Sequence, residues 1–197
     1  MAMERPLRVT VFVLCLVPFA WLLYAATAGG LGPDPAEAIM HDTGEWSLRL
    51  LALTLLISPL RSWTGWPVLK LRRMLGLYAF FYACVHFLAF LQFFTGWTLP
   101  RLLQELAERP YITMGFLAWL LMLPLAITST RGMQRRLKRN WARLHQLVYP
   151  AAVFACLHLF WQARSDIGQA LVYIGVFAVL LAWRVHRRSQ KRLVASQ

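Results

Sequence analysis

The sequence predicts an all-α membrane protein, a six-transmembrane-helix bundle with both termini in the cytoplasm. Of its 197 residues, 59% are hydrophobic, a larger share than soluble domains use, and only 8 are acidic. Charged residues gather in clusters that separate apolar stretches of roughly 17–22 residues, the length that a helix needs to cross a bilayer. The clusters alternate between basic and acidic composition, which predicts an even number of crossings.

The six predicted spans follow one another with short connections. The first covers 9–28; it follows the basic residues Arg5 and Arg8 and is too long for a removable signal peptide. The remaining spans are expected at 46–62, 74–95, 111–128, 144–162 and 167–185. No room remains for a separate soluble domain, so residues 1–197 are expected to form a single domain.

The orientation of the bundle follows from the distribution of lysine and arginine. The N-terminus, the loops 61–73 and 129–143 and the C-terminal tail hold most of the 21 basic residues. The intervening loops hold Arg101, Arg109 and Arg164 and all but one of the acids, which are Asp34, Glu37, Asp42, Glu45, Glu105, Glu108 and Asp166. We therefore expect the basic loops in the cytoplasm and, in a bacterial inner membrane, the acidic loops in the periplasm.

The formal net charge of +13 raises nucleic acid as a partner, but the position of the charges argues against it. The basic residues flank the apolar spans, where they set topology and touch anionic lipid headgroups. The densest run is Arg131–Arg143, and for some of its residues a docking or cofactor-phosphate role stays open.

Two histidines lie deep inside apolar spans at matching depth. His86 follows Arg72 by fourteen residues and His158 follows Arg143 by fifteen, so each lies ~21–22 Å from the cytoplasmic boundary. An imidazole in hydrocarbon is costly unless something binds it. A haem iron held by two axial imidazoles fits two level histidines on different spans. The alternative, for either one alone, is a helix–helix hydrogen bond.

His145 stands at the cytoplasmic mouth of the fifth span, thirteen residues before His158. That rise of ~20 Å suits two stacked haems, but thirteen steps turn ~220° beyond whole turns, so the two rings do not share a face of an ideal helix. Pro150 lies between them and could kink or overwind the helix enough to realign them. No histidine of the third span is level with His145, so His145 is a candidate ligand of a second haem, and the alternative is an interfacial role.

Arg49 is the one basic residue that we expect inside an apolar span, near the periplasmic end of the second. A cation there needs a partner, and a haem propionate at that level would serve. Snorkelling of the side chain to the surface is the alternative. His41 and His186 are expected to be solvated or interfacial.

With these residues placed, the chain resembles the haem-binding membrane subunit of the bacterial protein-methionine-sulfoxide reductase system, the MsrQ/YedZ family of the ferric-reductase-like transmembrane superfamily. The resemblance covers about residues 8–186 and depends on the order and spacing of several stretches. These are His41–Gly44, Arg72–Leu77, His86, Arg109–Gly115 and the run from Thr128 through Trp141, His145 and Tyr149 to His158.

The resemblance implies that His86, His145 and His158 are haem-associated and that the cofactor is haem b, one or two per chain. It implies an electron-transfer subunit that is not catalytic on methionine sulfoxide by itself. The donor would be the quinone pool or a cytoplasmic flavin or NAD(P)H reductase, and the acceptor a periplasmic molybdopterin-dependent methionine-sulfoxide reductase that repairs envelope proteins. Some members are described as flavin-associated, so FMN or another flavin is a further candidate cofactor, although no phosphate-binding motif is found.

Two other functions stay open. The first is a metalloreductase or a quinone-linked cytochrome b of the same superfamily with another acceptor. The second belongs to another class, a haem-free transporter; against it, no acidic residue lies clearly inside a span and no inverted repeat with broken helices is found. An intramembrane serine protease would need a G-x-S-x-G setting, which the sequence lacks.

Overall fold

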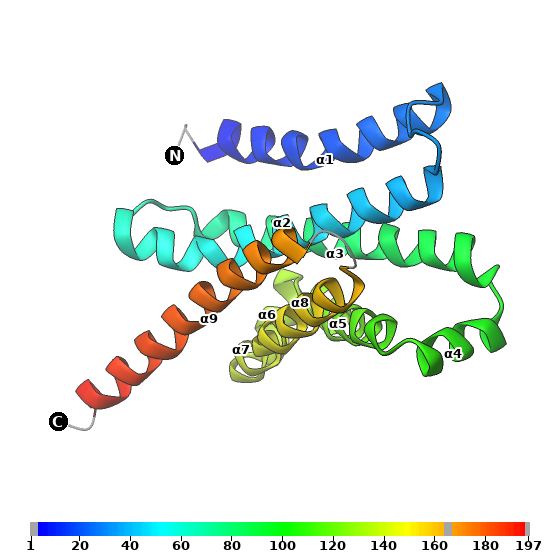
Figure 1. Cartoon of the computed structure of the whole chain (residues 1–197). Helices are drawn as coiled ribbons and strands as arrows, with labels where there is room; N and C mark the ends of the chain where they lie inside the picture. The colour runs from blue at the N-terminus through cyan, green and yellow to red at the C-terminus, as the bar shows by residue number, and fades with distance from the viewer. Residues whose placement is uncertain (1–3, 164–166, 196–197) are drawn as a thin grey trace. The chain divides into compact units, whose positions relative to one another are not determined.

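The computed structural model describes residues 4–163 and 167–195, and all the regular elements of that part are helical (Figure 1). The prediction of an all-α protein is confirmed. In chain order the elements are α1 Glu4–Ala28, α2 Pro35–Thr64, α3 Leu69–Phe90, the π-helical turn η1 Leu91–Thr95, α4 Leu99–Glu108, α5 Pro110–Ile127, α6 Arg131–Leu137, α7 Arg139–Leu144, the 3₁₀ turn η2 His145–Leu147, α8 Val148–Gln162 and α9 Ile167–Ala195. Arg164 and Asp166, which we assigned to a periplasmic loop, lie outside the described residues.

Five helical segments of the described residues are long and apolar enough to cross a membrane. They are Pro6–Ala28, Leu69–Thr95, Pro110–Ile127, Arg139–Gln162 and Ile167–Gln190, and they match five of the six predicted spans. The remaining one, 46–62, lies inside α2 but is not among the five, because Arg49 and Arg61 interrupt its apolar run. The sixth crossing and the orientation of the termini stay predictions.

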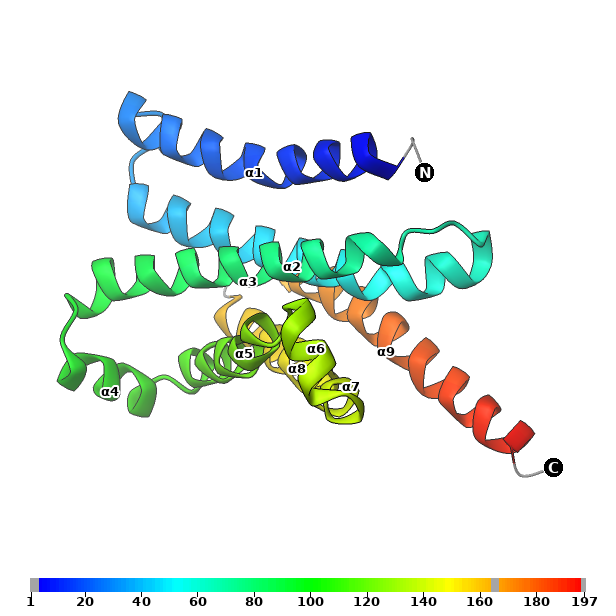
Figure 2. The same cartoon turned by 180° about the vertical axis from the view of Figure 1, so that it is seen from behind.

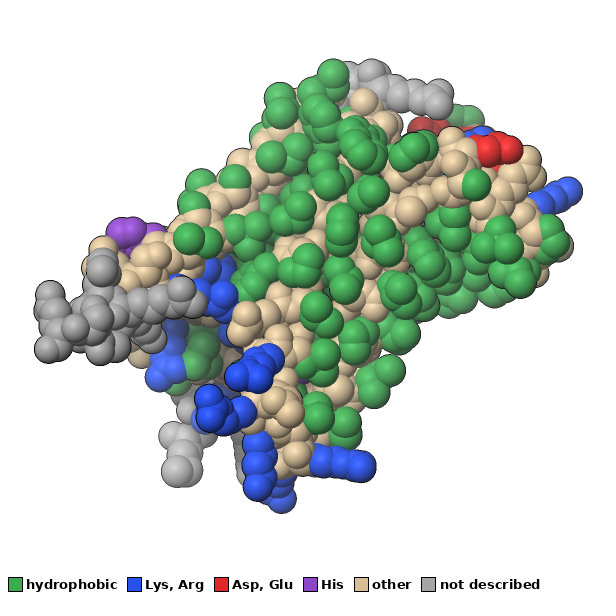
Figure 3. Space-filling model, turned by 90° about the horizontal axis from the view of Figure 1, so that it is seen from below, with side chains coloured by type: hydrophobic (Ala, Val, Ile, Leu, Met, Phe, Trp, Pro, Cys, Tyr) green, Lys and Arg blue, Asp and Glu red, His purple; other side chains and the backbone are tan. Residues whose placement is uncertain are grey.

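The surface of these segments is apolar, as lipid contact requires. On α1, for example, Leu14, Trp21 and Leu23 are all more than half exposed. Hydrophobic side chains cover much of the face shown in Figure 3, and lysine and arginine side chains gather toward the lower edge of that view.

The acidic segment 34–45, which the sequence placed in a loop, is helical from Pro35 onward. The Asp34 carboxylate accepts a hydrogen bond from the Glu37 backbone N–H at 2.9 Å, and Pro35 follows Asp34 directly. A capping carboxylate before a proline at the first helical position is a standard helix start. As a result Asp42 and Glu45 lie on α2, which begins eleven residues before the predicted second span at 46. Helix α4, which we did not predict, occupies the loop after the third span.

The chain forms two compact units, Met1–Thr54 with Lys70–Pro110 and Leu55–Leu69 with Tyr111–Gln197. In the first unit, Tyr82 of α3 connects to α1. The Tyr82 hydroxyl accepts from the Phe19 N–H at 3.0 Å and donates to the Cys15 carbonyl at 2.8 Å, the pair that an unbroken helix joins directly. Pro18 lies beside this point, and insertion of a side chain into the ladder is one recognised cause of a helix bend.

Helices α2 and α3 of the first unit are held in register by two small polar contacts. The Ser47 hydroxyl donates to the Ala79 carbonyl at 3.0 Å. A Cβ added at Gly76 would meet the Thr54 methyl carbon at 3.5 Å, an ordinary van der Waals distance, so the two helices pack closely there. This packing places His86, further along α3, against the first turns of α2.

In the second unit, α8 packs on α9 (Figure 2). The buried Arg184 joins α9 to the second half of α2. Pro59 has no N–H, so the Leu55 carbonyl four residues earlier loses its partner in the helix. Arg184, only 7% exposed, donates to that carbonyl and to the Leu180 carbonyl, the latter at 2.8 Å. Our prediction that Arg49 is the one basic residue inside a span is therefore wrong, because Arg184 lies within 167–185 and is buried.

Candidate functional site

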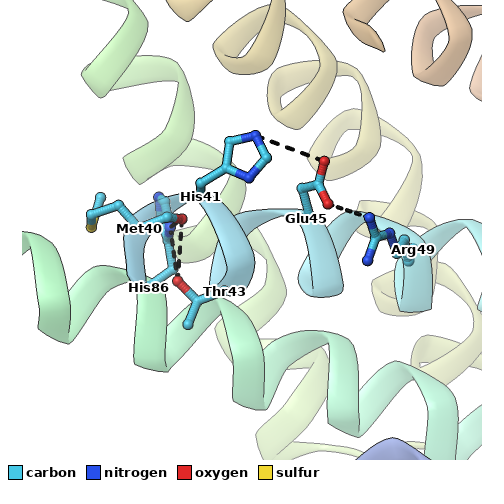
Figure 4. Close-up of polar contacts among 6 residues, drawn as sticks. All are labelled: Met40, His41, Thr43, Glu45, Arg49 and His86. Atoms are coloured by element: carbon cyan, nitrogen blue, oxygen red, sulfur yellow. Dashed lines mark hydrogen bonds and ion pairs between the residues drawn. The ribbon is translucent and has the colours of Figure 1, made fainter. Parts of the chain in front are cut away.

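His86 lies on α3 with its imidazole against α2. Its Nδ1 is 3.0 Å from the Met40 carbonyl oxygen and 3.4 Å from the Thr43 hydroxyl oxygen (Figure 4). Thr43 donates to the Ile39 carbonyl at 2.6 Å. Because a carbonyl oxygen can only accept, the Met40 contact assigns the ring proton to Nδ1, and Nε2 then carries the lone pair. This is the tautomer that binds a metal through Nε2.

Gly44 makes the contact between His86 and α2 sterically allowed. A Cβ at this position would lie 3.2 Å from both Cε1 and Nδ1 of His86, closer than side chains normally pack. Gly44 follows Met40 by one helical turn. One turn of α2 therefore supplies both the hydrogen-bond acceptor and the space for the ring.

His158 has the same arrangement in the second unit, between α8 and α5. Its Nδ1 is 2.7 Å from the Tyr111 carbonyl oxygen, so the proton is again assigned to Nδ1 and the lone pair to Nε2. A Cβ at Gly115, one turn after Tyr111, would lie 2.8 Å from Nδ1 and 3.0 Å from Cε1. That approach leaves no space for any side chain at 115. The Tyr111 ring lies beside the imidazole, with centroids 6.1 Å apart.

Sequence reasoning located both histidines and missed the four residues that hold them. These are Met40, Gly44, Tyr111 and Gly115. A signal was present: two of the stretches that carry the family resemblance, His41–Gly44 and Arg109–Gly115, each end on one of these glycines. The structure gives those stretches a physical reason, since each ends on a glycine that packs on one imidazole. The second stretch also contains Tyr111, whose carbonyl contacts His158, whereas Met40 directly precedes the first stretch.

His145 is held differently, by its own segment of chain. Its Nδ1 is 3.1 Å from the Trp141 carbonyl oxygen one turn earlier, and its ring stacks on the Trp141 indole with centroids 3.9 Å apart. The indole N–H donates to the Thr128 carbonyl at 2.9 Å. Thr128, Trp141 and His145 thus form a connected group, and the His145 proton is also on Nδ1.

The helix containing His145 and His158 is overwound at its start, in the direction that we expected. The turn His145–Leu147 is a 3₁₀ helix that ends shortly before Pro150. A 3₁₀ turn adds about 20° per residue relative to an α-helix, hence ~60° over three residues. The mismatch in an ideal helix is ~140°, so this turn brings the two rings closer to one face without aligning them.

Arg49 has a protein partner that we did not predict. Its guanidinium pairs with the Glu45 carboxylate one turn earlier on α2 (Figure 4). It also lies 4.9 Å from the centre of the Trp46 ring. The Glu45 side chain is 10% exposed, and the His41 Nε2 atom lies 3.8 Å from its other oxygen. The i, i+4 spacing of Glu45 and Arg49 was readable from the sequence and was missed because Glu45 was assigned to a loop.

The remaining histidines agree with the sequence analysis. The His41 side chain is 59% exposed, and His186 is exposed on α9. Neither contributes to the two histidine–glycine arrangements.

A family model and curated relatives place the chain in the same family of membrane proteins. Residues 43–156 match the family model described as "Ferric reductase like transmembrane component". The chain is 51% identical over 173 residues to the protein-methionine-sulfoxide reductase heme-binding subunit MsrQ of Xanthomonas axonopodis pv. citri (strain 306), covering 87% of this chain and 79% of that relative. It is 40% identical over 192 residues to the protein of the same name from Polaromonas naphthalenivorans (strain CJ2), covering 94% and 88%. No solved structure matches the chain.

Proposed function

Since the chain belongs to the ferric-reductase-like transmembrane family and is a multi-pass membrane protein, we propose that it is the haem-binding electron-transfer subunit of a protein-methionine-sulfoxide reductase system. The observation that carries the proposal is the arrangement shared by His86 and His158. Each imidazole is held through Nδ1 by a backbone carbonyl of a neighbouring helix and packs on a glycine one turn later.

The residues around these histidines fit axial ligation of haem b. A hydrogen bond from Nδ1 to a carbonyl fixes the tautomer and the ring plane and raises the basicity of Nε2, as it does for most metal-binding histidines. The glycines keep each ring at a defined distance from its neighbouring helix. Haem bound by His86 and His158 would supply reversible one-electron transfer, with the ligands and the burial setting its potential. That both histidines serve one iron is supported by their matching distance from the basic cluster before each span, fourteen residues from Arg72 to His86 and fifteen from Arg143 to His158.

Two further residues belong to the proposal. His145, with its proton on Nδ1 and its ring stacked on Trp141, is the proposed ligand of a second haem. Arg49 is the proposed partner of a haem propionate. A guanidinium presents N–H donors in a planar fork, a geometry that binds carboxylates such as a haem propionate.

The proposed partners follow from the family and from the names of the relatives, which describe a subunit of a reductase. We propose a periplasmic molybdopterin-dependent methionine-sulfoxide reductase as acceptor. The proposed donor is the quinone pool or a cytoplasmic reductase that uses flavin and NAD(P)H, and FMN is a candidate second cofactor. Location in the bacterial inner membrane and a single functional domain over 1–197 complete the proposal; the family match runs through residues of both compact units.

The experiment that tests the function is a dithionite-reduced minus oxidised absorbance spectrum of the detergent-purified protein, with haem quantified per polypeptide. We expect a low-spin b-type spectrum and a stoichiometry of one or two. Absence of haem after expression with ample haem supply would contradict the proposal.

The acceptor is tested on the reduced protein. We expect it to donate electrons to the molybdenum-containing partner and not efficiently to chelated ferric iron. The reverse preference would favour the metalloreductase alternative.

A further inference from the structure

Helices α8 and α9 carry alternating arginine and aromatic side chains at one end of the second unit. The Arg188 guanidinium carbon lies 5.1 Å from the centre of the Tyr149 ring, and that of Arg184 lies 5.9 Å from the same ring. Arg184 also lies 5.9 Å from the Trp183 ring, and Arg187 lies 5.2 Å from it. Three positive charges therefore share two aromatic rings. We call these five residues the arginine–aromatic ladder.

The three arginines of the ladder have different environments. Arg184 is buried, and its hydrogen bonds to the Leu55 and Leu180 carbonyls orient it within the protein. Arg187 and Arg188 are exposed, and Arg188 contacts the Tyr149 hydroxyl at 3.5 Å. The inner arginine thus holds the two rings, while the outer two present their N–H groups at the surface.

The sequence around the ladder supplies almost no negative charge. Asp166 is the one acidic residue of the sequence from 111 to 197, and it lies outside the described residues. Guanidinium groups bind phosphate through paired N–H donors more strongly than they bind neutral acceptors. The ladder is therefore suited to an anion that comes from outside the chain.

The surroundings of the ladder are those of a membrane–water boundary. Trp63 packs edge-on against Trp183, with centroids 6.4 Å apart, and is 70% exposed. Tryptophan and tyrosine concentrate at this level of a bilayer. Both Tyr149 and Trp183 lie within segments that are apolar enough to cross a membrane.

One face of α9 continues from the ladder as an apolar stripe. Val172, Val176 and Val179 are all exposed and are spaced three or four residues apart. The same spacing continues to Trp183 and then to Arg187, so these five positions share one helical face. An acyl chain can lie along the valines while its headgroup reaches the arginines. This stripe favours a lipid over a soluble phosphate.

We propose that the arginine–aromatic ladder binds the phosphodiester of an anionic phospholipid, with the phosphate on Arg187 and Arg188 and an acyl chain along Val179, Val176 and Val172. By the distribution of basic residues this end of the molecule faces the cytoplasm, where juxtamembrane arginines bind anionic lipid. The lipid would stabilise the packing of α8 on α9, because Tyr149 and Trp183 belong to different helices of that pair.

The test is native mass spectrometry of the full-length protein exchanged into phosphatidylglycerol or phosphatidylcholine with the same acyl chains. We expect retained phosphatidylglycerol and little phosphatidylcholine. The double variant Arg187→Gln with Arg188→Gln should weaken retention of phosphatidylglycerol about thirtyfold. The matched control is Arg101→Gln with Arg109→Gln, which removes two exposed arginines that the sequence assigns to the acidic loops and should leave retention unchanged.

Three results would overturn the lipid site. They are equal retention of the two lipids by the unaltered protein, equal weakening by the control pair, and displacement of phosphatidylglycerol by millimolar inorganic phosphate. The first and third are measured on the unaltered protein, so they decide the matter even where a variant fails to fold. Haem content is followed in parallel; we expect no change in the double variant, which separates this site from the proposed haem ligands.

Discussion

The imidazole of His158 lies directly against Gly115, so closely that a methyl group there would overlap its Nδ1 atom at 2.8 Å. Replacing Gly115 by alanine should displace the ring and weaken its bond to the Tyr111 carbonyl. Overpacking of this kind costs about 1–3 kcal/mol. We expect less haem bound at limiting haem supply and a broadened low-spin spectrum. Gly44→Ala should act in the same direction but less strongly, since the corresponding distance to His86 is 3.2 Å.

Gly175→Ala is the control for both glycine variants. This glycine also lies in a helix, α9, but a Cβ added to it meets nothing within 4 Å. Its haem content and spectrum should equal those of the unaltered protein. An equal loss of haem in all three variants would show that the helices, and not the histidine contacts, respond to the change.

Replacing either proposed axial ligand should remove the low-spin haem signal. In His86→Ala or His158→Ala the proposed haem would lose one of the two imidazoles that give its iron a low-spin state. Absorbance and electron paramagnetic resonance spectra of the purified variants measure this. His186→Ala, which changes an exposed histidine of α9, should leave both spectra unaltered. Retention of the full wild-type signal in either ligand variant would refute the assignment.

His145→Ala tests the second haem. If the unaltered protein carries two haems, the variant should carry one and should keep the signal that depends on His86 and His158. Trp141→Phe is the companion variant, because it keeps a stacking ring on His145 and removes the N–H that bonds to Thr128. We expect it to retain both haems with a shifted potential for one. A stoichiometry unchanged by His145→Ala would leave His145 with an interfacial role.

Removing either charge of the Arg49–Glu45 ion pair should shift the haem midpoint potential, and the two shifts should have opposite signs. A positive charge near a haem favours the reduced state, so Arg49→Gln should lower the midpoint potential, while Glu45→Gln should raise it. Because the Arg49 side chain is 41% exposed, water screens the effect, and we expect shifts on the order of tens of millivolts. Spectroelectrochemical titration measures both. Shifts of the same sign would exclude a simple charge effect.

The Arg184 hydrogen bond to the Leu55 carbonyl predicts that a change at Pro59 can restore stability lost by a change at Arg184. Arg184→Met leaves that buried carbonyl unsatisfied and should lower the free energy of unfolding by about 1–3 kcal/mol. Adding Pro59→Ala restores a backbone N–H for the same carbonyl and should recover part of the loss. Thermal unfolding in detergent measures the single and double variants. Strictly additive effects would show that Pro59 and Arg184 are unrelated.

The sequence predicted most of the helices because a long apolar run has few alternatives to a membrane-spanning helix. It predicted too late a start for α2, since the first turns carry Glu37, Asp42 and Glu45 and lack an apolar pattern. Asp34 followed by Pro35 was a readable start signal that the charge pattern overrode. Helix α4 was missed for a similar reason, because its ten residues are too few and too polar to resemble a span.

At the candidate site, the depth of the two histidines singled them out in the sequence. The carbonyls and glycines around them could not be predicted. A backbone carbonyl such as that of Met40 or Tyr111 exists at every residue, so nothing in the sequence marks it as a partner. The glycines were visible, but the helix that each one faces depends on tertiary packing. Arg184 falls at the end of the predicted span 167–185, close to the exposed Arg187 and Arg188, and only the structure shows that it is buried and bonded to two carbonyls.

The Tyr82 hydroxyl bonds to the Phe19 N–H and the Cys15 carbonyl, and this contact has a consequence for membrane insertion of the chain. Synthesis and membrane insertion proceed from the N-terminus, so α1 enters the bilayer before α3 exists. Until α3 is inserted, the Tyr82 hydroxyl cannot bond to the Phe19 N–H or to the Cys15 carbonyl. The final geometry of α1 around Pro18 is therefore completed during insertion of α3, and biogenesis of the first helix ends only with the third.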